Sequence, residues 1–217
     1  MSADEQTTLR SLVALPSGWL PVVAACGSGA ALIGLAVTWV GLAVAGVSPG
    51  GSDVARWTVG GPISALEGAI WFHFDAHWVR VRTGPGPSAT TFGHPLIQAD
   101  AALWPLRAVV AVVGLGAATA VRHLGIDDAL TGAAAGSSAT IGYLPTMLAL
   151  RAVSRVPLTR HAADGTAPVP GADGIPVSRA TGVAAGPELA ATLVLVTGVG
   201  VVVGGLGGAV AAAATAD

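Results

Sequence analysis

The sequence predicts an all-α integral membrane protein with four transmembrane helices and one interfacial or re-entrant amphipathic helix. Of its 217 residues, 53% are hydrophobic, 10% are charged and 31 are glycine. The mean hydropathy is +0.71. A soluble domain carries about a quarter charged residues, so this composition cannot cover a water-facing surface. Long stretches without charge are the second observation, and they divide the chain into spans.

Three such stretches, and a fourth that contains a single arginine, are long enough for a transmembrane helix, because a bilayer core of about 30 Å needs about 20 apolar residues. The expected spans cover residues 19–45, 101–121, 129–150 and 189–212. Arg107 lies near the start of the second span, where a long side chain can reach the membrane surface. We expect one membrane domain over residues 1–217 and no separate soluble domain.

Residues 57–81 are the ambiguous segment. They include four ionisable side chains: Glu67, His73, Asp75 and His77. An acid near the middle of a spanning helix costs about 2.5–3.5 kcal/mol, which disfavours a crossing. We interpret the segment as an interfacial or re-entrant helix from about Pro62 onward. Two alternatives stay open: a strand over 71–81, where apolar and polar residues alternate, and a fifth transmembrane helix over 57–79.

Arginine distribution predicts the orientation. With four spans, Arg10 and Arg122 lie on one side of the membrane, and the other side holds Arg56, Arg80, Arg82, Arg107, Arg151, Arg155, Arg160 and Arg179. The richer side is expected to be cytoplasmic. A five-span topology also places the loop 151–188 in the cytoplasm, so only the side of the N-terminus depends on residues 57–79.

Small residues line two predicted helices. Gly200, Gly204 and Gly208 recur every four residues in the last span, and Gly132 and Gly136 do so in the third. Such stripes allow two helices in lipid to approach closely. They predict tight helix packing, either within the chain or in a homo-oligomer.

Candidate chemistry is confined to the aromatic tract. His73 and His77 are four residues apart, so a helix places both rings on one face, and Asp75, Glu67 or His94 could complete a metal site. This spacing alone is weak evidence for a metal site, and we expect the two histidines to form a hydrogen-bonded pair without metal. His77 is expected to be partly hydrated and reachable by protons, since its ordinary pKa lies near 6.5.

Other functional classes are disfavoured. The sequence contains no motif of a hydrolase, a zinc protease, a nucleotide-binding loop or a dinucleotide-binding fold. We therefore expect a protein that is not an enzyme and needs no cofactor. A net charge of −2 gives no reason to expect nucleic acid as a partner. The expected partner is the lipid bilayer, with other membrane subunits or further copies of the chain.

One tract resembles a known family. The residues AIWFHFDAHWVRV (69–81) are similar to the W-x-F-x-N-A-H-F-V tract of an uncharacterised family of small haloarchaeal integral membrane proteins. GAAAGSSATIGYLP (132–145) and the Gly186-Pro187-Glu188-Leu189 turn extend the likeness. Asp75 and Trp78 depart from that pattern. The resemblance implies an archaeal membrane and, because some members are loosely labelled transporters, a general transport role.

Two functions are weighed most strongly. The first is a non-enzymatic membrane protein that works through helix association or as a subunit of an assembly, indicated by the glycine stripes. The second is a small-solute or ion permeation protein, indicated by Pro145 with its Ser and Thr neighbours and by the segment 57–79. His73, Asp75, His77, Trp78, Pro145 and Arg107 are the candidate functional residues.

Overall fold

The computed structural model describes residues 15–50, 61–83, 90–91, 96–97, 101–167, 175–180 and 182–215. Residues 57–60 of the predicted interfacial segment, His94 and most of the linker 84–93 lie outside this part of the chain. The described chain is mostly helical, as predicted.

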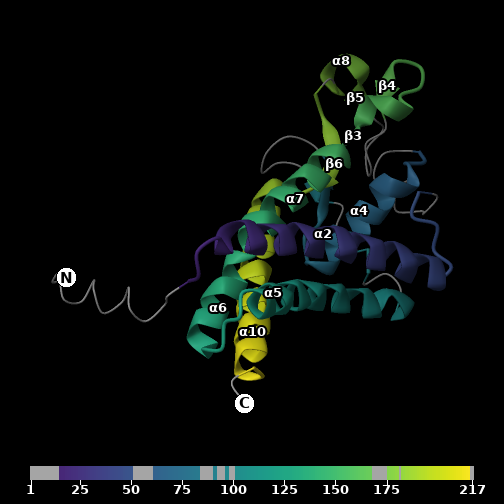
Figure 1. The fold of residues 1–217 in the computed structure, drawn as a ribbon. Coiled ribbons are helices and arrows are strands. Elements are labelled where there is room, and N and C mark those ends of the chain that lie inside the picture. Colours follow the sequence, from purple (N-terminus) through teal and green to yellow (C-terminus); the bar gives the residue numbers. More distant parts are fainter. Residues whose placement is uncertain are drawn as a thin grey trace. The chain divides into compact units, whose positions relative to one another are not determined.

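In the part of the chain that the structure describes, three helices are long and apolar enough to cross a membrane (Figure 1). The first is α2 (Trp19–Val44). The second joins η1 (Ala101–Val110) to α5 (Ala111–His123), and the third joins α9 (Leu189–Ala191), the π-helical turn η3 (Thr192–Val196) and α10 (Thr197–Ala213). These helices agree with three of the four predicted spans.

The fourth predicted span, 129–150, is not confirmed as one continuous helix. It forms α6 (Ala129–Ser138) and α7 (Thr140–Val153), of 10 and 14 residues, which meet at Ala139. Hydroxyl groups compete for the backbone there: Ser138 Oγ donates to Ala134 O at 2.8 Å, and Thr140 Oγ1 donates to Ser137 O at 2.7 Å. Such bonds compete with and distort the regular helical ladder.

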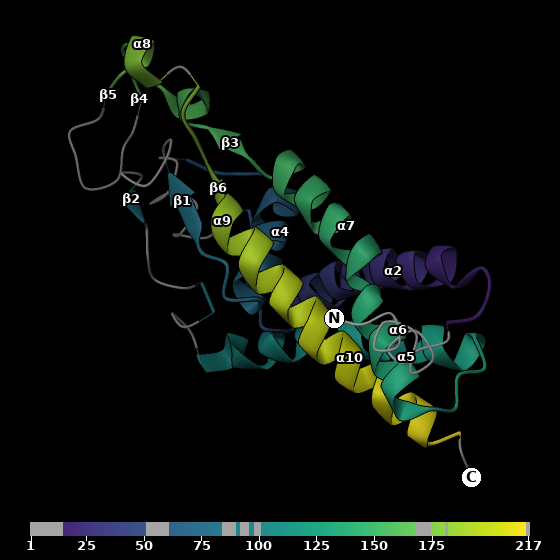
Figure 2. The same ribbon diagram turned by 90° about the vertical axis from the view of Figure 1, so that its left-hand side faces the viewer.

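The chain folds into two compact units. Unit 1 comprises residues 1–34, 110–147 and 196–217, and unit 2 comprises residues 35–109 and 148–195. In unit 1, α10 packs against α5 and α6, so segments far apart in sequence lie side by side (Figures 1 and 2). The core beside them consists of Val121, Ile126, Ala135, Ala211 and Ala212.

Unit 2 contains α4 (Ala65–Ala76) and a four-stranded antiparallel sheet in the order β2-β1-β6-β3. Its strands are β1 (Val81–Thr83), β2 (Thr90–Thr91), β3 (Val156–Pro157) and β6 (Ala184–Pro187). Val81 pairs with Pro187, and Val156 pairs with Ala185. Figure 2 shows β1 and β6 side by side.

The expected polar loop 151–188 is therefore structured in its described part. Besides β3 and β6 it holds η2 (Leu158–His161), the paired strands β4 (Thr166–Ala167) and β5 (Ile175–Pro176), and α8 (Val177–Ala180). These strands correct the prediction of an all-α chain. Their side chains Val156, Ala167 and Ala185 are buried, which gives the strands a core to pack on.

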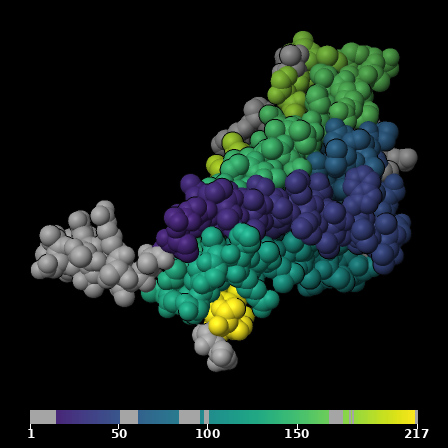
Figure 3. Space-filling view, in the orientation of Figure 1, coloured from purple at the N-terminus to yellow at the C-terminus, as the bar shows by residue number. Residues whose placement is uncertain are grey.

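Within the segment 62–81, residues 65–76 form the helix α4, as favoured over a strand, and Val81 begins β1. The helix is not amphipathic. All residues from Glu67 to Ala76 are buried. By contrast, α2 is exposed along much of its length and lies on the face seen in Figure 3. Its exposed apolar side chains include Leu32, Ile33, Val37, Val40 and Val44. An exposed face of this composition suits contact with lipid rather than water.

Candidate functional site

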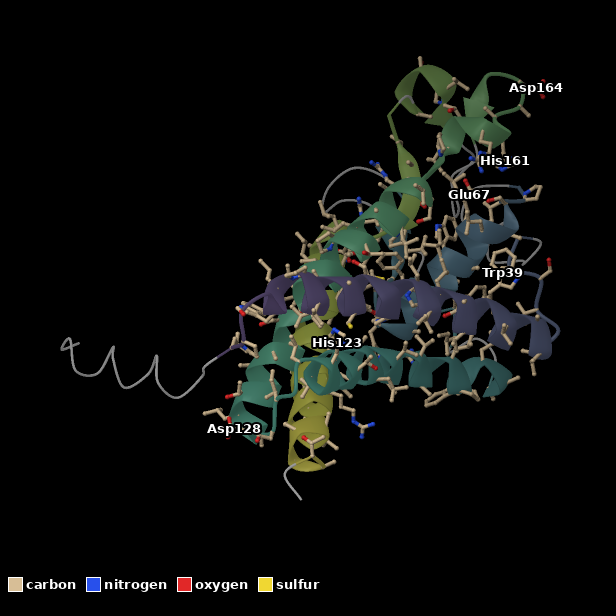
Figure 4. The ribbon with its side chains drawn as sticks, viewed as in Figure 1. Trp39, Glu67, His123, Asp128, His161 and Asp164 are labelled. Atoms are coloured by element: carbon tan, nitrogen blue, oxygen red, sulfur yellow. The ribbon has the colours of Figure 1, made fainter. Side chains whose placement is uncertain are left out.

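The N-terminus of α4 is fixed by a capping box and an ion pair. Ser64 Oγ accepts from the Glu67 backbone N–H at 3.1 Å, and the Ser64 N–H donates to Glu67 Oε2 at 2.8 Å. Both terminal nitrogens of the Arg160 guanidinium donate to the Glu67 carboxylate, at 2.8 and 2.9 Å. Glu67 and His161, labelled in Figure 4, mark where η2 meets α4. Glu67 is thus a structural group and not a metal ligand.

Burial and bonding act on Glu67 in opposite directions. Desolvation favours the neutral acid, but the hydrogen bonds from Arg160 and Ser64 and the charge of Arg160 together lower the pKa of Glu67. The carboxylate is therefore ionised at neutral pH and keeps its partners.

A histidine on α4 and the histidine that caps its C-terminus form a buried polar pair. The His73 and His77 side chains are both fully buried, with ring centroids 4.9 Å apart in an edge-to-face arrangement. His73 Nδ1 lies 3.1 Å from Thr38 Oγ1, and His77 Nδ1 donates to His73 O at 2.8 Å. The buried His73 Nε2 has no hydrogen-bond partner in the described part of the chain.

Both imidazoles are held neutral. Burial, with the nearby His77, lowers the pKa of His73 well below its usual value. Burial also lowers the pKa of His77 to about 4, against the opposing effect of its bond to His73. The prediction that His77 is hydrated and reachable by protons is wrong, because packing within unit 2 removes the ring from water.

Asp75, in the last turn of α4, is a buried acid. Its side chain is 1% exposed, and Oδ2 accepts from the Ile97 backbone N–H at 2.9 Å. Oδ1 is buried with no hydrogen-bond partner among the described residues. Burial raises the pKa of Asp75, while the Ile97 bond and the charges of Arg107 and Arg80 oppose the rise. The group therefore titrates closer to neutrality than an exposed aspartate does.

The C-terminus of α4 ends in an unusual turn. Trp78 N–H donates to Asp75 O at 2.9 Å and Val79 N–H donates to Phe74 O at 3.0 Å, the bonding pattern of a Schellman motif. This motif requires a left-handed residue, normally glycine, and here Trp78 has φ 60°. The Arg107 guanidinium stacks on its ring, 4.7 Å from the centroid. Both terminal nitrogens of Arg107 are buried without a hydrogen-bond partner among the described residues.

The predicted site residues fall into two sets. His73, Asp75, His77, Trp78 and Arg107 all lie in unit 2. The glycines and Pro145, which lies inside α7, belong to unit 1. Sequence reasoning missed Thr38, the Ile97 N–H and Ser154 O, which accepts from the Trp71 indole at 2.9 Å. Only the Ser64-x-x-Glu67 capping signature was readable in advance.

The glycine stripes contact each other inside unit 1. A Cβ on Gly204 would lie 2.6 Å from Gly136 O, and a Cβ on Gly208 would collide with Gly132 O. A Cβ on Gly200 would collide with Thr140 Oγ1. Both glycine stripes are therefore used for helix packing within a single chain.

The metal hypothesis has no geometric support in the described residues. They contain no group of three or more His, Cys, Asp or Glu side chains that could hold a metal ion. His73 and His77 instead engage Thr38 and a backbone carbonyl.

A mostly helical chain with three membrane-length apolar helices has the make-up of an integral membrane protein. The chain belongs to a family of unknown function, DUF7978, whose match covers residues 3–215. The resemblance to an uncharacterised family is confirmed at this level, and a haloarchaeal origin stays a prediction. No match to the chain was found among curated proteins or among solved structures.

Proposed function

We propose that the protein is a multi-span membrane protein that passes small ions, with Asp75 binding and releasing a proton on the path. The supporting observation is the burial of Asp75 with one oxygen, Oδ1, that has no partner among the described residues. Ionisable groups buried in membrane proteins are costly, and they mark ion and proton paths by default.

The surroundings of Asp75 suit a group that changes its protonation state. The ionised form gains from the Ile97 N–H bond and from the charges of Arg107 and Arg80, and burial favours the neutral form. Burial is the largest of these effects, so the pKa of Asp75 is raised despite the opposing bond and charges.

Assembly with other chains, the other function weighed from the sequence, has less support. The evidence for assembly was the pair of glycine stripes, and these stripes pack against each other inside unit 1. In our proposal the protein has no enzymatic role, the segment 129–150 forms a fourth, bent membrane crossing, and the loop 151–188 lies in the cytoplasm.

Proton flux into liposomes tests this proposal. Purified protein is reconstituted with an entrapped pH-sensitive dye, and a potassium gradient with valinomycin supplies the driving voltage. We expect wild-type flux above that of empty liposomes. Asp75→Asn removes the titrating group and should lower the flux about tenfold or more.

Asp128→Asn is the matched control, because Asp128 is an exposed helix cap and asparagine also caps helices. It should conduct like the wild type. Wild-type liposomes that conduct no better than empty ones would overturn the permeation function. Equal flux through the wild type and Asp75→Asn would show that Asp75 does not take part in ion passage.

A further inference from the structure

Three tryptophans of unit 2 are exposed, and each comes from a different element. Trp39 on α2 is 41% exposed, Trp78 after α4 is 51% exposed and Trp104 on η1 is 57% exposed. Figure 4 labels Trp39 on α2. Trp71, by contrast, is 1% exposed, and its indole N–H is bonded to Ser154 O. Exposure of large aromatic side chains is therefore selective.

Contacts within unit 2 place the three tryptophans close to one level. A Cβ on Gly41 would collide with the Leu106 side chain, so α2 meets η1 at these residues. Trp39 and Trp104 each precede that contact by two residues, but the two helices run in opposite directions, so the two tryptophans lie on either side of it, about 7 Å apart along the helix axes. Trp78 is tied to the same level, because the Arg107 guanidinium stacks on its ring.

Arginine accompanies this band. Arg80 is exposed two residues after Trp78, and Arg107 lies one turn after Trp104. Indole rings favour the boundary between hydrocarbon and water, where the ring is sheltered and the N–H stays hydrogen-bonded. Arginine near this boundary gains about 1 kcal/mol from anionic head groups.

We infer that Trp39, Trp78 and Trp104 form one aromatic belt seated in the head-group region of a single membrane leaflet, with Arg80 facing lipid phosphate. The belt does not depend on any ion flux through Asp75. It fixes the depth of unit 2 in the bilayer.

The belt also bears on the number of crossings. Because the end of α2 and the start of η1 lie at one level, the chain between them returns to the side from which it left. A 12-residue helix such as α4 is about 18 Å long, too short for a 30 Å core. The described helix of the segment 57–79 is therefore too short to form the fifth span considered from the sequence.

Depth-dependent fluorescence quenching tests the belt. The chain has six tryptophans, so four variants each keep one of Trp39, Trp78, Trp104 or the buried Trp71 and carry phenylalanine at the other positions. Each is reconstituted in phosphatidylcholine vesicles containing phosphatidylglycerol, with quenchers on the head group, high on the acyl chain or at its end. We expect the three belt tryptophans to be quenched most by the shallow probes, with Trp39 and Trp104 differing in depth by at most about 7 Å. Trp71 should respond weakly to all of them.

Several results would overturn the belt. Strongest quenching by the acyl-end probe would place the rings in the hydrocarbon. Quenching by aqueous iodide without quenching by lipid probes would place them in water. Lipid quenching that appears only when the protein is highly diluted in lipid would mean that a second copy covers the rings.

A further comparison covers the case in which a multiple variant fails to fold. In the wild-type chain, Arg80→Gln should lower the preference for phosphatidylglycerol around the protein, read as resonance transfer from tryptophan to a labelled anionic lipid. Arg122→Gln, at an exposed position in unit 1, should leave that transfer unchanged. Equal transfer from both variants would exclude the phosphate contact at Arg80.

Discussion

At the scale of single residues, Trp78 combines two opposing effects. A non-glycine residue in the left-handed region costs about 1–2 kcal/mol. The Arg107 guanidinium over its ring contributes about 0.5–1 kcal/mol at a partly exposed site. The cost of the left-handed backbone at Trp78 therefore equals or exceeds the free energy gained from the Arg107 contact. This strained residue lies three positions after Asp75.

Substitution separates these two effects. Trp78→Ala loses the ring contact and keeps the strain, whereas Trp78→Gly loses both. We expect the glycine variant to be more stable than the alanine variant by about 1 kcal/mol, the reverse of the usual order in regular structure. Thermal unfolding in detergent measures the difference. Alanine equal to or above glycine would show that the turn is not left-handed.

Stability should fall as the pH is lowered below neutrality. His77 has an ordinary pKa of 6.5 and a folded-state pKa of about 4, so the unfolded chain takes up its proton first. The loss begins below pH 6.5, is complete near pH 4 and reaches about 3 kcal/mol from this group. His73 acts in the same direction.

The pH dependence of unfolding measures this effect. His77→Gln, which cannot titrate, should flatten the decline between pH 6.5 and 4. The exposed His123 provides the control, since His123→Gln should leave the decline as it is. An unchanged slope in His77→Gln would mean that the ring is hydrated.

At the scale of elements, glycines on α10 differ by their surroundings. Gly204 faces Gly136 O so closely that a Cβ would be only 2.6 Å away, whereas a Cβ on Gly198 meets nothing within 4 Å. Gly204→Ala should therefore destabilise the protein by about 1–3 kcal/mol through overpacking. Gly198→Ala should be neutral or stabilising by up to about 1 kcal/mol, because alanine favours helix.

Unfolding of both variants in the same detergent gives the comparison. Similar stabilities for the two would indicate that α10 does not pack on α6 through this face. Gly198→Ala serves as the internal reference, since it changes the same residue type in the same helix.

Sequence reasoning located elements whose signal is local. Apolar length identified α2, the helix from η1 to α5 and the helix from α9 to α10, because hydropathy and length can be read from each stretch of sequence by itself. The β-strands escaped prediction since each has only two to four residues, and Val81 pairs with Pro187 far along the chain. Likewise, no local pattern could place Thr38 beside His73 or the Ile97 N–H beside Asp75.

At the scale of the whole molecule, the arginine distribution predicts which side each loop occupies. Single cysteines test it in a Cys26→Ala background, with Ala163→Cys in the loop 151–188 and Asp127→Cys between the second and third predicted spans. Both positions are exposed. We expect a membrane-impermeant maleimide added to intact cells to label position 127 and to leave position 163 unlabelled until the cells are opened. The opposite pattern would reverse the orientation.

The pairing of β1 with β6 also sets an order of events during synthesis. β1 leaves the ribosome about a hundred residues before β6, and until then the edge that it shares with β6 lacks its partner. An open strand edge readily pairs with a wrong chain. Leu189 begins the last apolar helix directly after Pro187 and Glu188, so β6 and the start of that helix leave the ribosome together. A ribosome that stops before residue 184 would release a chain with β1 still open, and quality control would have to remove it.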